Sequence, residues 1–387
     1  MNLAVGIPKE LKTGERRVSL TPKGVQYLHD QGITVYVEKS AGVLSGFSDD
    51  EYAQAGAVVV PDAAALWSKA GLIKKVKEPI EPEFKFFTPH HLIFTYLHLA
   101  SPSAASLIAA LKKSKTTAIG YETIEKNGEE PLLKPMSEIA GVLAAYYGAI
   151  FKSQIRISGT VLTGVAGAKS MIMETASAYP AVPKLRYEGS LLILGGGYVG
   201  RGAAEMAAQM GADIEISEIS DRRRKELSVH FKSKNLKISV LDPADTASYL
   251  NVLSLADVII GAVHSAGKRA PLVIDEQLLE KISRVKKKII LDVSIDQGGN
   301  IAESRPCSYD DLLYLDSFQN IRFSVANIPS VCGKGASLAL EAGSLEYAYH
   351  LACGLEHAVD VFPELKSGIN VLHGEVVHHA IIEAHSL

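Results

Sequence analysis

Short apolar runs separated by amphipathic segments divide the first part of the chain into strand and helix units. The first units are a strand at 2–7, a helix at 21–31 and a strand at 33–38. Thr21 is the expected N-cap of that helix, and Pro22 takes its first position. Further strands are predicted at 56–60, 71–77, 91–97 and 116–122, and further helices at 62–70 and 101–113. Short strands alternating with helices indicate a parallel sheet covered by helices on both faces.

A second alternating series follows a long apolar helix predicted at 136–155. Its strands are expected at 190–194, 214–217, 237–241, 257–263, 288–295 and 322–328, and helices are expected again at 335–352 and 374–384. The predicted fold is therefore α/β, with two doubly wound, Rossmann-like parallel sheets joined by long helices. We expect a discontinuous first domain, 1–135 with 334–387, and a nucleotide-binding domain at 136–333 inserted into it.

A glycine-rich loop between the strand 190–194 and the next helix carries the most specific signal. The candidate cofactor-binding residues of this loop are Gly195, Gly197, Tyr198, Val199 and Gly200, in a G-x-G-x-x-G pattern. Since the loop follows a strand and opens a helix, it has the context of a dinucleotide-binding turn. Glu218 ends the following strand, where an acid would bind ribose hydroxyls and repel a 2′-phosphate, which favours NAD over NADP. The arginine run 222–224 could instead accept that phosphate, so NADP stays open.

Composition and charge exclude several classes of protein. The 387 residues are 47% hydrophobic and carry a net charge of −3, which gives no reason to expect a nucleic acid or an anionic membrane as partner. The chain has three cysteines without paired spacing, so neither a disulfide framework nor a metal site is predicted. Without a signal peptide or an apolar run long enough to span a membrane, a soluble cytoplasmic protein is expected.

Polar residues follow several of the predicted strands. Arg17 lies beyond the first strand, while Lys77 and His98 end the strands 71–77 and 91–97. Asp296 follows the strand 288–295 and precedes two glycines. The strand ends of a parallel sheet share one edge, where ligands bind. The cationic side chains of Arg17 and Lys77, together with the His98 imidazole, therefore suit a small anionic substrate that exchanges protons. Each residue alone could equally be a solvated rim or turn residue.

Together these stretches resemble the alanine dehydrogenase family, which includes the NAD(H)-binding subunit of transhydrogenase and the lysine-forming saccharopine dehydrogenases. The matching stretches span nearly the whole chain: VGIPKELKTGERRVSLTP, KVKEP, FTYLHLA, GYETIE, PLLKPMSEIAG, the glycine-rich loop, DVSIDQGG, SRPCSYD, VANIP and LKSGINVLHGEV. The resemblance implies an active site in the cleft between two domains. It also implies a homo-oligomer, either a dimer or a hexamer.

The resemblance assigns roles to individual positions. Arg17 and Lys77 match the residues that bind the substrate carboxylate, and His98 and Asp296 match the catalytic acid/base pair. Ser137, Glu218, Val263 and Arg305 fall on cofactor-contact positions, and Asn327 on the segment that lines the substrate site. The implied reaction is NAD-dependent oxidative deamination of an amino acid, with L-alanine giving pyruvate and ammonium.

Three segments depart from the family pattern: 156–189 is longer, and 264–271 and 330–338 differ in sequence near the expected active site. Another amino acid, or an opine-type condensation as in saccharopine dehydrogenase, therefore remains an alternative substrate chemistry. A transhydrogenase subunit and a catalytically silent NAD sensor are further alternatives. The full set of Arg17, Lys77, His98 and Asp296 favours a dehydrogenase over both.

Overall fold

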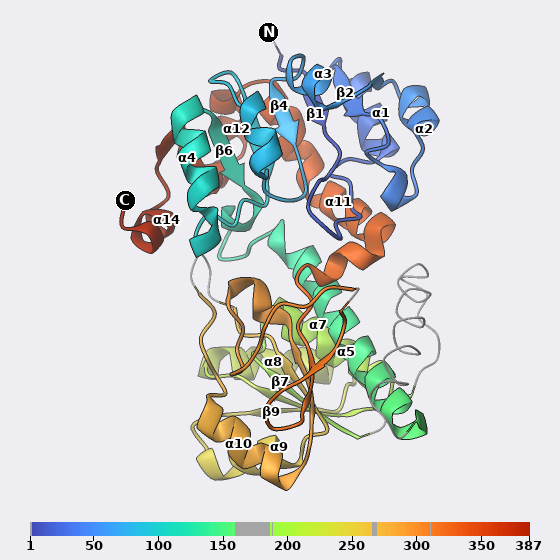
Figure 1. The fold of residues 1–387 in the computed structure, drawn as a ribbon, viewed down its shortest axis with the longest axis vertical. Coiled ribbons are helices and arrows are strands. Elements are labelled where there is room, and N and C mark those ends of the chain that lie inside the picture. Colours follow the sequence, from blue (N-terminus) through green and yellow to red (C-terminus); the bar gives the residue numbers. More distant parts are fainter. Residues whose placement is uncertain (1, 159–185, 188, 265–268, 310) are drawn as a thin grey trace. The chain divides into compact units, whose positions relative to one another are not determined.

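The computed structural model describes residues 2–158, 186–187, 189–264, 269–309 and 311–387. Two compact units divide the chain: Met1–Met136 with Cys332–Leu387 form unit 1, and Ser137–Ser265 with Arg269–Val331 form unit 2 (Figure 1). Most of the departing segment 156–189, and 265–268 within the segment 264–271, lie outside the described residues. In the described part of the chain, no helix is long and apolar enough to cross a membrane.

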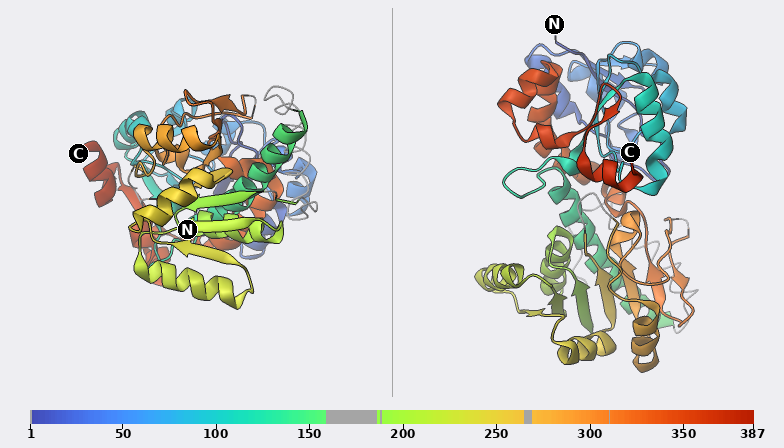
Figure 2. Two further views of the ribbon diagram at one scale, coloured as in Figure 1. Left: turned by 90° about the horizontal axis from the view of Figure 1, so that it is seen from below. Right: turned by 90° about the vertical axis from the view of Figure 1, so that its left-hand side faces the viewer.

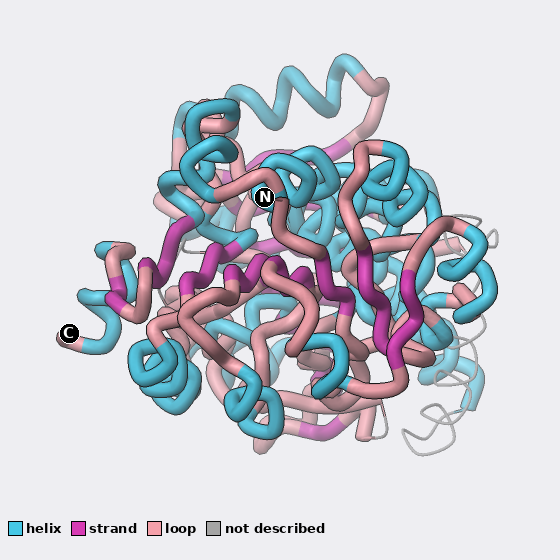
Figure 3. Tube along the Cα trace, turned by 90° about the horizontal axis from the view of Figure 1, so that it is seen from above, coloured by secondary structure: helices cyan, strands magenta, loops and turns pink. Residues whose placement is uncertain are grey.

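Unit 1 contains one eight-stranded sheet, in the order β15-β14-β6-β5-β4-β1-β2-β3 (Figure 3). The parallel strands are β1 (Val5–Ile7), β2 (Val35–Glu38), β3 (Val58–Val60), β4 (Leu72–Lys74), β5 (Leu92–Thr95) and β6 (Thr117–Gly120). The edge strands β14 (Ile369–Leu372) and β15 (Glu375–Val376) are antiparallel. The order reverses between β1 and β4, and such a switch point is where doubly wound sheets bind ligands at the carboxyl ends of their strands.

Helices cover both faces of this sheet. On one face, α3 (Ala63–Trp67), α4 (Ala105–Ser114) and α14 (His379–His385) pack on a core that includes Ile73 and Ile93. Neighbouring side chains of a strand point to opposite faces of the sheet, so β4 also contacts an element on the other face. That element is α11 (Gly333–Ala352). The remaining helices are α1 (Pro22–Asp30), α2 (Asp49–Gln54), α12 (Leu355–Val361), α13 (Leu365–Gly368), and the 3-10 turns η1 (Val43–Ser45), η2 (Glu81–Phe86), η3 (Pro102–Ala104), η4 (Tyr121–Thr123) and η6 (Ile328–Cys332).

Unit 2 contains a seven-stranded sheet, in the order β12-β13-β11-β10-β7-β8-β9 (Figure 2). Its strands are β7 (Ser190–Leu194), β8 (Asp213–Ser217), β9 (Ile238–Leu241), β10 (Val258–Gly261), β11 (Ile289–Asp292), β13 (Ile321–Phe323) and the antiparallel edge strand β12 (Tyr314–Leu315). The six parallel strands have the order of a dinucleotide-binding fold, with the switch point between β7 and β10. The prediction of two doubly wound sheets is confirmed.

Helices also lie on both faces of the second sheet. α9 (Thr246–Leu255) and α10 (Glu276–Val285) bury Leu253 and Ile282 against Ile259 and Ile290. α5 (Leu133–Ser158) and α7 (Tyr198–Gln209) pack on the opposite face, and α8 (Asp221–Ser233) follows β8. α5 extends beyond the predicted helix 136–155 by three residues at each end.

Several sequence-based assignments are wrong in part. The predicted strand 322–328, for example, ends at Phe323, and Ile328 begins the turn η6. The predicted strand 288–295 ends at Asp292, and Val293–Gln297 forms the 3-10 turn η5, because the Asp292 carboxylate binds the backbone of the following loop. The predicted helix 374–384 instead begins with the turn of the β14–β15 hairpin, where Gly374 adopts a φ of 85°, continues as β15, and is helical only in α14.

Candidate active site

Unit 1 places the predicted Arg17 in an irregular segment after β1, beside the switch point. The guanidinium is buried and forms two hydrogen bonds to the Glu15 carboxylate, from Nε to Oε1 at 2.8 Å and from Nη2 to Oε2 at 2.7 Å. Its Nη1 lies 3.2 Å from the sulfur of Met136. Burial would lower the pKa of Arg17, but the charge of Glu15 outweighs it and raises that pKa, so the guanidinium stays cationic.

Lys77 and His98 meet at the same edge of the sheet. Lys77 follows β4 and His98 follows β5, and these two strands are parallel neighbours. Lys77 Nζ lies 3.2 Å from His98 Nε2, and Lys77 is only 4% exposed. The imidazole is about a third exposed, so it combines a cationic neighbour with access to solvent. Such a pair can bind a small anionic ligand and exchange protons with it.

Glu78 is a neighbour of this pair that the sequence had not singled out as functional. Its carboxylate forms an ion pair with Lys12 Nζ at 2.5 Å. Burial alone would raise the pKa of Glu78. The positive charges of His98, Lys77 and Lys12 outweigh burial and lower the pKa to about 2. The acid therefore stays ionised and balances part of the positive charge.

Glu122 fixes the backbone that carries the histidine. Its carboxylate accepts hydrogen bonds from Leu97 N at 3.1 Å and from His98 N at 2.6 Å. His98 adopts a φ of 49°, a left-handed conformation that costs free energy in any residue except glycine. The same carboxylate lies 3.9 Å from His98 Nδ1, and the Tyr96 ring stacks on the imidazole at 6.0 Å. Glu122 lies in the quoted GYETIE stretch, but no sequence pattern indicated this contact.

Unit 2 places the glycine-rich loop between β7 and α7, at its switch point. A Cβ at Gly200 would lie 2.0 Å from Gly195 O, and Gly195 has a φ of 95° and packs against Val263. These two glycines are therefore required by the close approach of the chain to itself. A Cβ at Gly197 would meet no atom within 4 Å, which leaves room for a ligand at the N-terminus of α7. The free N–H groups and dipole of that terminus suit a pyrophosphate.

Glu218 lies directly after β8 and next to the loop. Its carboxylate accepts hydrogen bonds from Gly196 N at 3.0 Å and from Ser220 N at 2.8 Å. Arg224, from the arginine run that could have accepted a phosphate, forms an ion pair with Asp242 at 2.7 Å and donates to the Glu218 carbonyl. This arrangement leaves a carboxylate, held by backbone donors, at the position expected to meet a ribose.

Asp296 is the exposed residue of the turn η5, which Gly298 and Gly299 follow with φ values of 100° and 81°. The residue that shapes this turn is Asp292, which the sequence analysis did not select. Its buried carboxylate accepts from Asn300 N at 2.8 Å, Ile301 N and Ser304 Oγ. A Cβ at Gly299 would lie 2.7 Å from Asp292 Oδ2, so the glycine is needed for this close contact.

The other predicted cofactor contacts are distributed over unit 2. Val263 lies beside the glycine loop, and its carbonyl accepts from Ser294 Oγ in the turn that carries Asp296. Ser137 lies on α5, next to Glu138, whose carbonyl would be 2.7 Å from a Cβ at Gly202 of α7. Arg305 is exposed, with its guanidinium 4.1 Å from the centre of the Tyr314 ring. Asn327, which is predicted to bind substrate and not cofactor, also lies in unit 2 and has a φ of 66°.

Comparisons with known proteins agree with this arrangement. A sequence model described as alanine dehydrogenase/PNT, N-terminal domain, matches residues 6–140, and the corresponding C-terminal domain matches residues 141–379. The alanine dehydrogenase of Methanococcus maripaludis is 36% identical over 389 residues, which cover 100% of this chain and 97% of that protein. The alanine dehydrogenase of Bacillus subtilis is 34% identical, covering 98% and 94%.

Solved structures give the same result. A structure of an L-alanine dehydrogenase superposes with a TM-score of 0.83 at 36% identity and covers 99% of both chains. A transhydrogenase from Sinorhizobium meliloti superposes with a TM-score of 0.71 and covers 97% of this chain and 99% of that one. At 20% identity, the second likeness concerns the fold alone.

Proposed function

The chain belongs to the alanine dehydrogenase/PNT family, and from that premise we propose that it is an NAD-dependent L-alanine dehydrogenase. The reaction is the reversible oxidative deamination of L-alanine to pyruvate and ammonium. The observation that supports it best is the meeting of Lys77 and His98, 3.2 Å apart, at the sheet edge that also carries Arg17. A carboxylate substrate that gains and loses protons requires this combination.

Residues of unit 2 support NAD as the cofactor. The open space at Gly197 and the N-terminus of α7 would hold the pyrophosphate. The Glu218 carboxylate would accept hydrogen bonds from the ribose hydroxyls and would repel a 2′-phosphate, so NAD is favoured over NADP. When bound, NAD would supply the acceptor for the hydride that the amino-acid Cα loses, and hydrolysis of the resulting imino acid would give the 2-oxo acid and ammonium.

The residues of the chain bind the substrate and transfer protons. Arg17 and Lys77 hold the carboxylate, which orients the Cα hydrogen. His98 donates and accepts the proton at the carbonyl or hydroxyl oxygen, with Lys77 beside its Nε2. Asp296 exchanges the proton of the attacking water or leaving ammonia. The proposed carboxylate ligands Arg17 and Lys77 lie in unit 1, and the proposed cofactor-binding residues lie in unit 2. By the same family resemblance, we expect a homo-oligomer.

The test is a comparison of cofactors and substrates in one assay. The purified chain is mixed with NADH, ammonium and pyruvate, and the loss of NADH absorbance is followed. NADPH, a panel of other 2-oxo acids, and lysine in place of ammonium are run in parallel. Fast turnover with pyruvate and NADH supports the proposal.

The other outcomes separate the alternatives. Activity only with another 2-oxo acid, or only with lysine, would keep the reaction class and refute alanine as the substrate. A rate with NADPH equal to that with NADH would refute the role of Glu218. Absence of turnover, with NADH still bound, would refute the dehydrogenase and favour a sensor or a partner subunit.

A further inference from the structure

The segment that carries Arg17 has no strand partner for its backbone. Residues 15–21 lie between β1 and α1, outside any strand or helix, and residues 17–21 are all buried. Buried backbone groups require hydrogen-bond partners, and an irregular segment cannot find them in a sheet ladder. Side chains from other elements of unit 1 provide these partners.

Three polar residues on one stripe of α11 face this segment. Ser337, Glu341 and Ser344 are four and three residues apart, which places them on one side of a helix. Ser337 and Ser344 are fully buried, and Glu341 is 5% exposed. Polar residues on a buried helix face cost free energy unless they are paired, so their partners show what the stripe does.

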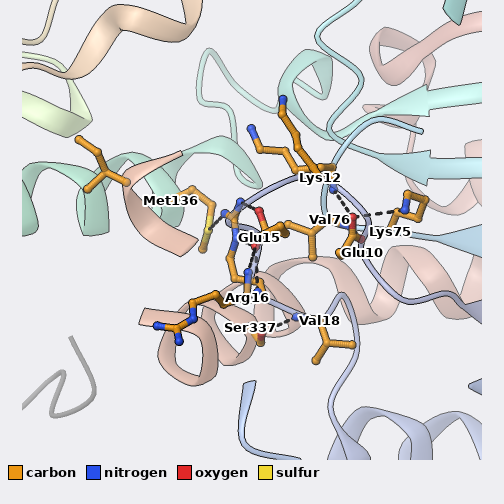
Figure 4. Close-up of polar contacts among 12 residues, drawn as sticks. Glu10, Lys12, Glu15, Arg16, Val18, Lys75, Val76, Met136 and Ser337 are labelled. Carbon is orange, nitrogen blue, oxygen red and sulfur yellow. Dashed lines mark hydrogen bonds and ion pairs between the residues drawn. The ribbon is translucent and has the colours of Figure 1, made fainter. Parts of the chain in front are cut away.

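Each residue of the stripe acts on the segment. Ser337 Oγ accepts from Val18 N at 2.9 Å (Figure 4). The Glu341 carboxylate accepts from Thr21 N at 2.5 Å and from Thr21 Oγ1 at 2.9 Å. Ser344 Oγ accepts from Lys74 Nζ at 2.9 Å, and that ammonium donates to the Ser19 carbonyl at 2.5 Å. The stripe therefore fixes the backbone on the C-terminal side of Arg17.

The residue on the other side of Arg17 is fixed by Ser45 of η1, a turn that packs on the same helix. Ser45 Oγ donates to the Arg16 carbonyl at 2.7 Å and lies 3.2 Å from Ser337 Oγ. A Cβ at Gly333, the first residue of α11, would lie 2.8 Å from that carbonyl. The backbone is thus bound directly before and directly after Arg17.

We propose that Ser337 and Glu341 are positioning residues for the substrate-carboxylate site, because they hold the Arg17 segment on α11. This rests on the proposed function of Arg17. Neither residue touches the substrate. A shift of the segment would move the guanidinium, and displacements of about 1 Å can reduce binding or rate by up to about a hundredfold.

The experiment compares four variants of the full chain. Ser337→Ala and Glu341→Gln remove one acceptor and one charge of the stripe. Arg17→Lys keeps the charge but loses the guanidinium fork. Thr116→Val is the matched control, because it removes a buried hydroxyl that bonds Thr88 O and has no contact with the stripe. The KM for pyruvate, the KM for NADH, kcat and the melting temperature are measured for each.

We expect Ser337→Ala and Glu341→Gln to raise the KM for pyruvate about tenfold or more, with the KM for NADH unchanged within about twofold. Thr116→Val should lower the melting temperature without changing the pyruvate KM. A lower melting temperature with an unchanged pyruvate KM in both stripe variants would overturn the proposal. If Ser337→Ala does not fold, Ser45→Ala is measured instead, because it removes the hydrogen bond to the Arg16 carbonyl.

The proposed function fails separately. An unchanged pyruvate KM in Arg17→Lys would refute Arg17 as the carboxylate ligand, and the positioning role would fail with it. A raised KM in Arg17→Lys together with an unchanged KM in the stripe variants would refute the positioning role alone.

Discussion

Replacing Glu78 by glutamine should destabilise unit 1, by an amount that depends on pH. Folding lowers the pKa of this carboxyl from 4.5 to about 2. Each pKa unit corresponds to about 1.4 kcal/mol, so the shift sets an upper limit of about 3 kcal/mol. The side chain is 20% exposed and solvent screens part of this, so we expect a loss of about 2 kcal/mol at neutral pH.

The sign of the pH dependence follows from the lowered pKa. The stabilisation from Glu78 is fully present above the unfolded pKa of about 4.5 and is lost as the pH falls through the folded pKa of about 2. The gap in unfolding free energy between wild type and Glu78→Gln should therefore be constant near neutrality. It should narrow in acid, once the carboxyl of the wild type is protonated in both states.

Urea unfolding followed by tryptophan fluorescence is the assay. Trp67 is the only tryptophan of the chain and is 2% exposed in α3, so its emission reports on unit 1. Glu125→Gln, at an exposed glutamate of the same unit, is the control and should change little. If Glu78→Gln is as stable as wild type at pH 7, or if the gap does not narrow in acid, the electrostatic account of this site is refuted.

Four further substitutions test unit 2. Asp296→Asn should abolish turnover while NADH still binds in a fluorescence titration, and near-normal turnover would contradict its catalytic role. Gly197→Ala should weaken NADH binding at an unchanged melting temperature, whereas Gly200→Ala, with its Cβ 2.0 Å from Gly195 O, should lower the melting temperature. Asp257→Asn removes a carboxylate whose pKa is lowered to about 2 and which Lys152 and Lys286 contact, so calorimetry should show lower stability at neutral pH with KM values unchanged.

The sequence predicted the features that depend on local patterns. Alternating apolar runs identified the parallel strands of both sheets, and the spacing of Gly195, Gly197 and Gly200 identified the turn at a switch point. Thr21 and Pro22 marked the start of α1 correctly. These signals are local because strand alternation, tight turns and helix starts are determined by residues a few positions apart.

The residues that the sequence did not reveal act on distant parts of the chain. Glu122 binds the backbone at position 98, and Glu341 binds it at position 21, 320 residues away. A glutamate on a predicted helix such as 335–352 has no local feature that distinguishes a buried acceptor from a solvated surface residue. The strand predicted through 295 failed for the same reason, because the Asp292 carboxylate ends it through bonds to residues 300 and 301.

A common physical requirement connects these missed residues. The chain leaves each sheet at the carboxyl ends of the strands in irregular segments, and these segments carry the residues proposed for chemistry. Their buried N–H groups have no ladder partner, and one carboxylate can accept from two of them. Glu122 and Asp292 each accept hydrogen bonds from two backbone N–H groups. Glu341 accepts from one N–H and one hydroxyl. Removing one of these carboxylates would leave buried donors without an acceptor. These acids are therefore as necessary for the geometry of the site as the residues that touch a ligand.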